Sequence, residues 1–278
     1  MRRRSQRGVA VVLALLLTAL SVVLVTGIFW QQQVLVRSME GERLRTQGRL
    51  VAQSGIEVAR LQLLDAAAQA NVITLDGGWT TPVRQNELAQ RITDAQSRFN
   101  LRNLAPNGHV DLFQVTAFGR LLAALKLDAG LAYRVADFMA GASKGIDAEQ
   151  LNDLRGIAGF TPDTLDKLRD FVVVLPESTP INVNTASPEV LTSVVNFSLP
   201  EARALAERRH QAYFKGPSDF AFRLNDRETL EGVNYDVSSS YFLVSSEVRL
   251  SAAVMRMQGL LRRGAGQAGA QLMWLRQD

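Results

Sequence analysis

The sequence lacks cysteine altogether and has only two histidines, which removes much of the chemistry that side chains can perform. Without thiols the chain forms no disulfide, holds no zinc through thiolates and has no cysteine nucleophile. His109 and His210 lie far apart in the chain, and neither stands in a metal or nucleophile motif. No phosphate-binding loop, dinucleotide fingerprint or Gly-x-Ser-x-Gly motif is present either. We therefore predict no catalytic residue and no enzymatic activity.

The sequence also lacks a basic balance once its first residues are set aside. The formal net charge is +4, from 31 basic and 27 acidic residues. Four arginines stand within the first seven residues, at Arg2, Arg3, Arg4 and Arg7, which leaves 27 basic residues against 27 acidic ones. The rest of the chain therefore carries no overall positive charge that would indicate nucleic acid.

No ionisable side chain interrupts residues 9–29. As a helix this segment is about 31 Å long, which is enough to cross a bilayer. Trp30 follows the apolar run at the position expected for the membrane–water interface. The arginines that precede the run should stay in the cytoplasm. The apolar run is too long, and Phe29-Trp30-Gln31 too bulky, for a cleaved secretory signal peptide. Two alternatives stay open: a plain signal anchor, or a prepilin-type leader that ends at Gly8, with Val9 as the first mature residue.

The sequence after the predicted membrane segment favours continuation of the same helix. No strong helix breaker stands between residues 31 and 70. Ala52, Ile56, Ala59 and Leu63 recur at a spacing that places them on one face of a helix. We predict one continuous helix, apolar all round over 9–30 and amphipathic over 31–69. A membrane anchor followed by an unrelated first helix remains the alternative.

Beyond the long helix, the pattern predicts strands, then helices, then strands again. The predicted strands are 88–93, 98–104, 239–250, 252–261 and 271–276, because apolar residues alternate there or β-formers cluster. The predicted helices are 113–127, 129–140, 147–154, 161–174, a start at Ser187, 200–211 and 219–224. Residues 71–86 and 264–269 are predicted loops. A helical insertion over 106–237, between sheet segments 70–105 and 238–278, explains this order better than three independent domains.

At this point the chain resembles the minor pseudopilin K family of bacterial type II secretion systems. The resemblance rests on four segments: Arg7-Gly8-Val9, residues 52–59, residues 97–101, and Leu175-Pro176 together with 181–186 and 189–191. It implies an α+β, pilin-like fold, in which a transmembrane spine helix carries an antiparallel sheet with a large all-α domain inserted between its strands. Helix–hairpin–helix modules share the last of these segments.

The resemblance also implies how the chain is processed, where it is located and which partners it has. A prepilin peptidase would remove the leader, residues 1–8, at the Gly8–Val9 bond, and Val9 would be N-methylated. The mature chain would cross the inner membrane once and hold its soluble domain in the periplasm. There it would act as a non-enzymatic subunit at the tip of the pseudopilus, together with the other minor pseudopilins of the I and J types and the secretion machinery.

Leu13 supports the tip position within this resemblance. Most pilin-like subunits carry a glutamate at the fifth residue after cleavage, where it is thought to pair with the terminal amine of a neighbour during assembly. An intramembrane carboxylate is costly and persists only when it is paired. A subunit with Leu13 there lacks that docking contact. The other reading of Leu13 is an ordinary signal anchor.

Small residues along the long helix mark a candidate spine interface. Together with Leu13, we predict that Gly41, Gly48, Ala52, Gly55 and Ala59 let a partner helix approach closely. For Ala59, packing against the chain's own sheet is an equal alternative. For Gly48, nearer the membrane, contact with a partner helix is the prediction.

The sequence departs from the family where calcium would be expected. Many relatives carry a run of aspartates at the place that corresponds to residues 137–142, and only Asp137 remains here. Calcium takes six to eight oxygen ligands, which one carboxylate cannot supply. We predict no metal site and no cofactor at that place. If a calcium site exists, the acids near Asp226, Glu228, Glu231 and Asp236 are the other candidates.

A membrane-anchored DNA receptor is the alternative function. Residues 154–159 fit the glycine hairpin of helix–hairpin–helix proteins, in which backbone amides approach a DNA phosphate. DNA binding needs a cationic face, yet residues 153–170 hold four acids and three bases. The second candidate hairpin, 196–200, has no glycine. A hairpin used only for packing is the better reading, so we expect no nucleic acid partner.

Overall fold

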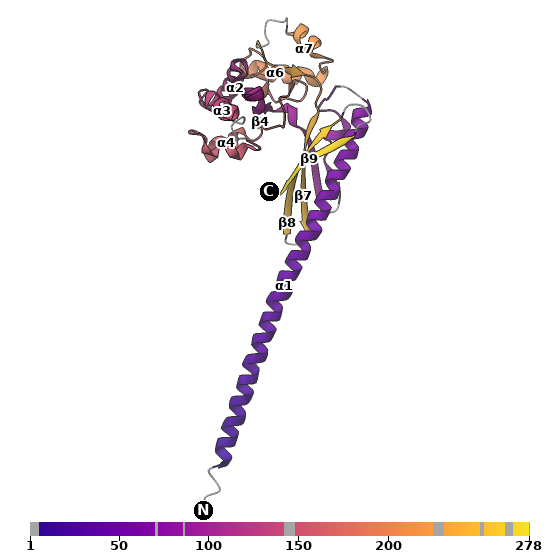
Figure 1. The fold of residues 1–278 in the computed structure, drawn as a ribbon. Coiled ribbons are helices and arrows are strands. Elements are labelled where there is room, and N and C mark those ends of the chain that lie inside the picture. Colours follow the sequence, from indigo (N-terminus) through magenta and orange to yellow (C-terminus); the bar gives the residue numbers. More distant parts are fainter. Residues whose placement is uncertain are drawn as a thin grey trace, which may run out of the picture.

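A long helix carries a sheet against its distal half and a helical domain beyond the sheet (Figure 1). The computed structural model describes residues 6–69, 72–85, 87–141, 148–224, 231–250, 253–264 and 269–277. The N-terminal end of the helix projects far from the folded part, as the indigo end of the ribbon shows. The leader residues 1–5, part of the predicted loop 264–269 and the predicted helix start at Asp147 lie outside the described residues.

Helix α1 runs without interruption from Gln6 to Gln69, over 64 residues. It contains no proline and only isolated glycines, so nothing breaks its ladder of backbone hydrogen bonds. The amphipathic face predicted for its distal half is confirmed, because Ala52, Ile56, Ala59 and Leu63 are almost completely buried. The helix is therefore both the membrane-length segment and part of the domain core.

An antiparallel sheet covers this face of α1. Its strand order is β1-β2-β7-β8-β9. The strands are β1 Val83–Gln85, β2 Leu88–Asp94, β7 Tyr241–Leu250, β8 Ala253–Arg263 and β9 Ala270–Gln277. Phe242 and Val244 of β7 pack with Ile56 of α1 and with Trp79 of the short 3-10 helix η1, Gly78–Thr80. Because β2 pairs with β7, the long stretch of chain between them leaves and re-enters the sheet at neighbouring strands.

The intervening stretch forms a second core of its own. Its helices are α2 Leu112–Ala124, α3 Leu131–Ala140, α4 Pro162–Leu168, α5 Pro188–Leu191, α6 Leu199–Gln211 and α7 Pro217–Arg223, with the 3-10 helix η6 Leu151–Gly156. Further 3-10 helices are η1 Gly78–Thr80, η2 Ala95–Ser97, η3 Leu101–Leu104 and η4 Pro106–Gly108. The predicted helix starts at Thr161 and Ser187 are confirmed, since each side chain accepts a hydrogen bond from the third residue after it.

Some predicted elements end early or differ, for local reasons. The predicted strand 98–104 is only the two-residue β3, Phe99–Asn100, because the Asn100 side chain accepts a hydrogen bond from the Arg102 amide and starts η3. Residues 113–127 are not helical throughout, because Lys126 has a φ of 60° and α2 ends before it. The predicted loop 71–86 includes η1 and β1.

The inserted domain also contains short strands, which the prediction of a wholly helical insertion did not include. Helix α4 ends at Leu168, and the chain then enters β4, Val172–Val173, which pairs in parallel with β3. The second parallel pair joins β5, Ile181–Asn182, to β6, Tyr235–Asp236. Both pairs connect segments that are distant in sequence. The predicted helix 161–174 is wrong over its last residues, because Val172 and Val173 pair with β3.

We predict that Gly55→Leu destabilises the domain. A Cβ atom at Gly55 would lie 3.2 Å from both Gln90 Oε1 and Leu88 Cδ2, so a leucine there overfills the space between α1 and β2. Overpacking of this kind costs about 1–3 kcal/mol. Thermal unfolding of the full chain in detergent, followed by circular dichroism, should show a lower Tm. Gly41→Leu is the matched control, because no atom lies within 4 Å of a Cβ there. An equal Tm for both variants would contradict the prediction.

Candidate functional site

The proximal half of α1 is an apolar surface with nothing packed on it. Every large apolar side chain from Val11 to Met39 is more than half exposed. Among the described residues, one helix is long and apolar enough to cross a membrane, and it is this one. The hydroxyls of Thr18, Ser21 and Thr26 donate to backbone oxygens of the preceding turn, so these three polar groups need no water as a partner. This surface suits lipid or a partner helix, and water would disfavour it.

Two of the six predicted spine positions, Leu13 and Gly41, and the predicted cleavage site lie in or next to this open half. Gly8 and Val9 belong to the first turns of α1. Leu13 is 55% exposed, and Gly41 has open space where a side chain would project. A neighbouring helix could approach α1 at Leu13 and Gly41 without displacing any part of this chain.

The other four spine positions are occupied by the chain's own sheet. Ala52 and Ala59 are fully buried in the contact between α1 and the sheet. The Gly55 carbonyl accepts a hydrogen bond from Gln90 Nε2 at 2.7 Å. A Cβ at Gly48 would touch Met255 and Leu250 of the β7–β8 hairpin at 3.4–3.5 Å. The prediction that Gly48 contacts a partner helix is thus at odds with the structure, because the hairpin reaches further toward the membrane than periodicity indicated.

A different face of α1 is exposed along the half of the helix that carries the sheet. Leu50, Val58 and Leu61 are 61%, 44% and 60% exposed. At 100° per residue they share one face, opposite to Ala52, Ile56 and Ala59. We call Leu50, Val58 and Leu61 the outer face of α1. These residues were not among the predicted interface positions, although their helical spacing places them opposite the face of small residues and could have indicated an apolar outer face.

A buried carboxylate joins the sheet to the inserted domain. Asp94, at the end of β2, is only 3% exposed. Its Oδ2 accepts hydrogen bonds from Thr185 Oγ1 and Ser239 Oγ, both at 2.6 Å, and from Asn182 Nδ2 at 3.0 Å. Its Oδ1 accepts from the Gln96 amide at 2.8 Å. The donors come from both sides of the junction, so this one side chain fixes how the two parts meet.

Burial raises the pKa of the Asp94 carboxyl above its usual range, and the hydrogen bonds from Ser239, Thr185, Gln96 and Asn182 only partly oppose that rise. The ionised side chain is therefore costly to keep in place. The carboxylate fixes the geometry of the junction instead, because all four hydrogen bonds can form only in one relative arrangement of the segments that carry the donors.

Buried amides extend this junction. Asn103 exchanges two hydrogen bonds with the backbone of Thr179, at 2.8 and 3.0 Å. Asn184 does the same with the backbone of Phe214, at 2.8 Å for both. Asn182 and Asn184 stand in the segment that carries the family resemblance, and sequence reasoning assigned them no role. In the structure their side-chain amides form hydrogen bonds with backbone groups that have no partner in a helix or sheet.

Both candidate hairpins are held by arginines of the same domain. Gly159 has a φ of +98°, and a Cβ there would meet Leu131 at 2.6 Å. Arg134 of α3 donates to the Ala158 carbonyl of this hairpin at 2.6 Å. Arg120 of α2 donates to backbone oxygens of the second hairpin region, including that of Phe197. These contacts explain the hairpins as packing elements, and the glycine serves a tight turn against α3.

The described residues contain no group of three or more histidine, cysteine, aspartate or glutamate side chains that could hold a metal. Asp137 lies exposed on α3, and Asp226 and Glu228 lie outside the described part. His109 and His210 are exposed. The residues that are described at the place expected for calcium do not fit that ion, because one exposed carboxylate supplies too few oxygen ligands.

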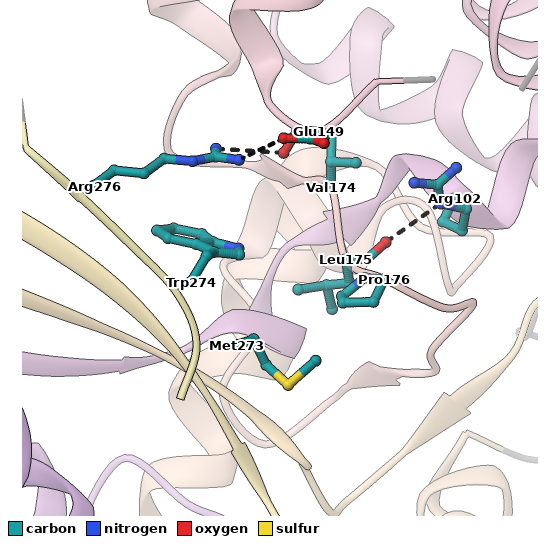
Figure 2. Close-up of a pocket in the computed structure, with 8 residues that line it drawn as sticks. All are labelled: Arg102, Glu149, Val174, Leu175, Pro176, Met273, Trp274 and Arg276. Carbon is teal, nitrogen blue, oxygen red and sulfur yellow. Dashed lines mark hydrogen bonds and ion pairs between the residues drawn. The ribbon is translucent and has the colours of Figure 1, made fainter. Parts of the chain in front are cut away.

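A cleft separates β9 from the inserted domain. Figure 2 shows Met273, Trp274 and Arg276 of β9 facing Leu175, Pro176 and Arg102 across it. The Arg276 guanidinium lies 4.5 Å from the centre of the Trp274 ring and forms an ion pair with Glu149 at 3.4 Å. This pair bridges the two parts at their exposed rim, where a salt bridge contributes little stability.

Comparison with known proteins points to one family. The family model for type II secretion system protein K matches residues 181–244, which run from β5 into β7. A protein of Pseudomonas aeruginosa described as type II secretion system protein K is 29% identical to this chain, with 94% of this chain and 90% of that protein aligned. The resemblance found in the sequence is thus confirmed, and it extends over nearly the whole chain.

A solved structure shares the fold. The crystal structure of the GspK-GspI-GspJ complex from the type 2 secretion system of enterotoxigenic Escherichia coli contains a chain that superposes with a TM-score of 0.70. The match covers 86% of this chain and 99% of that one, at 17% identity. The predicted α+β, pilin-like fold is confirmed by this likeness.

We predict that Asp94→Asn lowers the stability of the junction. If the new NH2 group takes the place of Oδ2, it faces three groups that donate to Oδ2 in the wild-type chain. Two donors cannot form a hydrogen bond with each other, so at least one buried group loses its partner. Such a loss costs about 1–3 kcal/mol. Thermal unfolding should show a lower Tm than for the wild-type chain, whereas Asp76→Asn, at an exposed position, should leave it unchanged. Identical melting of both variants would mean that the Asp94 network does not stabilise the fold.

Proposed function

We propose that this chain is a minor pseudopilin of the type II secretion system, a non-enzymatic subunit that supports protein export across the outer membrane. The observation that carries the proposal is the similarity to protein K over nearly the whole chain, together with a helix α1 whose proximal half is apolar and unpacked. A subunit of this kind works by assembly, so the relevant surfaces are faces of α1 rather than a catalytic pocket.

The N-terminal sequence sets the topology within this proposal. The arginines before Gly8 stay in the cytoplasm, α1 crosses the inner membrane, and the sheet and inserted domain stand in the periplasm. A prepilin peptidase cuts after Gly8, and Val9 becomes the methylated N-terminus. The membrane-spanning part of α1 remains in the mature protein.

The partners are other minor pseudopilins, of the I and J types. The related E. coli chain was solved in a complex named for GspK, GspI and GspJ, which supports this choice. On this chain, Leu13, Gly41 and the outer face of α1 are the open positions along the helix. The inserted domain stands at the far end of the molecule from the N-terminus (Figure 1), where it would obstruct the addition of a subunit above it. We therefore place the chain at the tip of the pseudopilus.

A DNA receptor is less well supported. Arginines of α2 and α3 donate to backbone carbonyls of both candidate hairpins, and residues 153–170 carry more acids than bases. We also propose that the chain works without calcium, because the described residues offer no acidic cluster.

The leader gives the first test. We predict that the protein in membranes begins at Val9, with a methylated amine, and that Gly8→Arg leaves an unprocessed precursor. The reason is that a basic leader, a small residue and an apolar run meet only at this bond. Mass spectrometry of the intact protein from membranes measures both. A mature N-terminus near residue 30, or a leader that is never removed, would show that the chain is not a pseudopilin.

The outer face of α1 gives the second test. We predict that Leu50→Glu combined with Leu61→Glu weakens association with the I-type and J-type subunits by about a hundredfold or more and lowers secretion. Burying a leucine in a complex contributes about 1.5–3 kcal/mol, and a glutamate there would lose that energy. The Tm of the chain should not change, because both side chains are exposed. Gln53→Glu, on the flank of α1, is the control. Normal complexes and normal secretion by the double variant would exclude this face as the interface.

A further inference from the structure

The sheet presents a group of arginines on the face that points away from α1. Arg84 of β1 pairs with Ala89, Ala89 pairs with Glu247, and Glu247 pairs with Arg256, so these residues form one row across four strands. Arg91 of β2 and Arg249 of β7 lie two residues from that row, and the side-chain period of a strand places them on the same face. We call Arg84, Arg91, Arg249 and Arg256 the arginine face.

The arginine face carries a net positive charge. Its one acid in the row, Glu247, already accepts hydrogen bonds from Arg249 at 2.7 Å and from Arg256 at 2.9 Å. These arginines lower the pKa of Glu247, which therefore stays ionised. Arg84 and Arg91 are exposed, and neither pairs with an acid anywhere in the described part of the chain. Glu87, whose backbone oxygen accepts a hydrogen bond from the Arg249 amide, is a second acid beside the row, so four cations stand against two anions and the net charge remains positive.

The surface there is also hollowed. A shallow cavity of about 490 Å³ is lined by Arg84, Arg91 and Arg256, together with Pro82 and Ser245. Guanidinium groups at the rim of a cavity can grip a carboxylate with two parallel hydrogen bonds. Glu247 and Met257 line the cavity as well, so its lining mixes polar and apolar groups, and the unpaired cations Arg84 and Arg91 suit it to an anionic ligand.

The position and size of the arginine face argue against two anionic ligands, lipid headgroups and DNA. The β7–β8 hairpin is the part of the sheet nearest the membrane, and it contacts Gly48, 18 residues beyond Trp30. At 1.5 Å per residue, the sheet begins about 27 Å above the membrane surface, which is beyond the reach of arginine side chains to lipid headgroups. This step rests on the membrane placement of α1 in the proposed function. DNA would need a basic surface longer than one row of four strands, which spans about 14 Å.

We propose that the arginine face docks a carboxylate-rich segment of a partner protein in the periplasm. The partner approaches from the side opposite to α1, so it is not a subunit packed along the helix. Arg84 and Arg91 supply the unpaired charges that receive its carboxylates. Arg256, held in place by Glu247, completes the rim, and Arg249 adds a further positive charge beside it.

The test measures binding of a short fluorescent oligoglutamate peptide to the full chain in detergent, by anisotropy. The wild-type chain should bind the peptide, and added salt should weaken binding. Arg84→Glu combined with Arg91→Glu should weaken binding about tenfold or more. Arg155→Glu combined with Arg208→Glu makes the same change in net charge on the inserted domain and should leave binding unchanged. Thermal unfolding checks that both double variants are folded.

Three results would overturn the proposal: no binding of the peptide by the wild-type chain, an equal loss in both double variants, or tighter binding of a short DNA duplex that depends on Arg84 and Arg91. An equal loss would mean that net charge alone is responsible. Preference for the duplex would mean that the ligand is nucleic acid. None of these measurements depends on leader processing or secretion, so their failure would leave the proposed function untouched.

Discussion

The packing of the distal half of α1 against the sheet is the contact on which the rest of the structure depends. Ala52, Gly55 and Ala59 bring the helix backbone close to the strands, and Ile56 fills the space between them. Because the same helix continues into the apolar segment, that segment is joined to the core of the folded domain with no linker between them. Any force or contact on the proximal helix is therefore passed directly to the sheet.

A second, polar contact sets where the inserted domain stands. The chain leaves the sheet after β2 and returns at β7, two strands that are hydrogen-bonded neighbours. At that point the buried Asp94 gathers donors from Thr185, Ser239 and Asn182. An apolar junction could slide or rotate at little cost, whereas four directed hydrogen bonds to one carboxylate cannot. This junction therefore defines the orientation of the helical domain relative to the helix that carries it.

The molecule thus offers two open surfaces on opposite sides of the sheet. The outer face of α1 is apolar and continues the line of the membrane segment, which suits neighbouring helices. The arginine face is polar and looks the other way. One chain can in this way meet subunits along its helix while it meets a different, acidic partner across its sheet. Electrostatic contacts of the second kind favour specificity and rapid association over affinity.

The sequence alone determined the features that depend on local patterns. The apolar run, the buried face of α1 at Ala52 and Ile56, the period-two strands and the caps at Thr161 and Ser187 all follow from spacing and side-chain chemistry. Tertiary structure decided what depends on register and on distant partners. It placed Gly48 under the β7–β8 hairpin, paired β3 with β4, and brought arginines of four strands onto one face. Local periodicity cannot report these contacts, because each is made by residues that the chain brings together only when it folds.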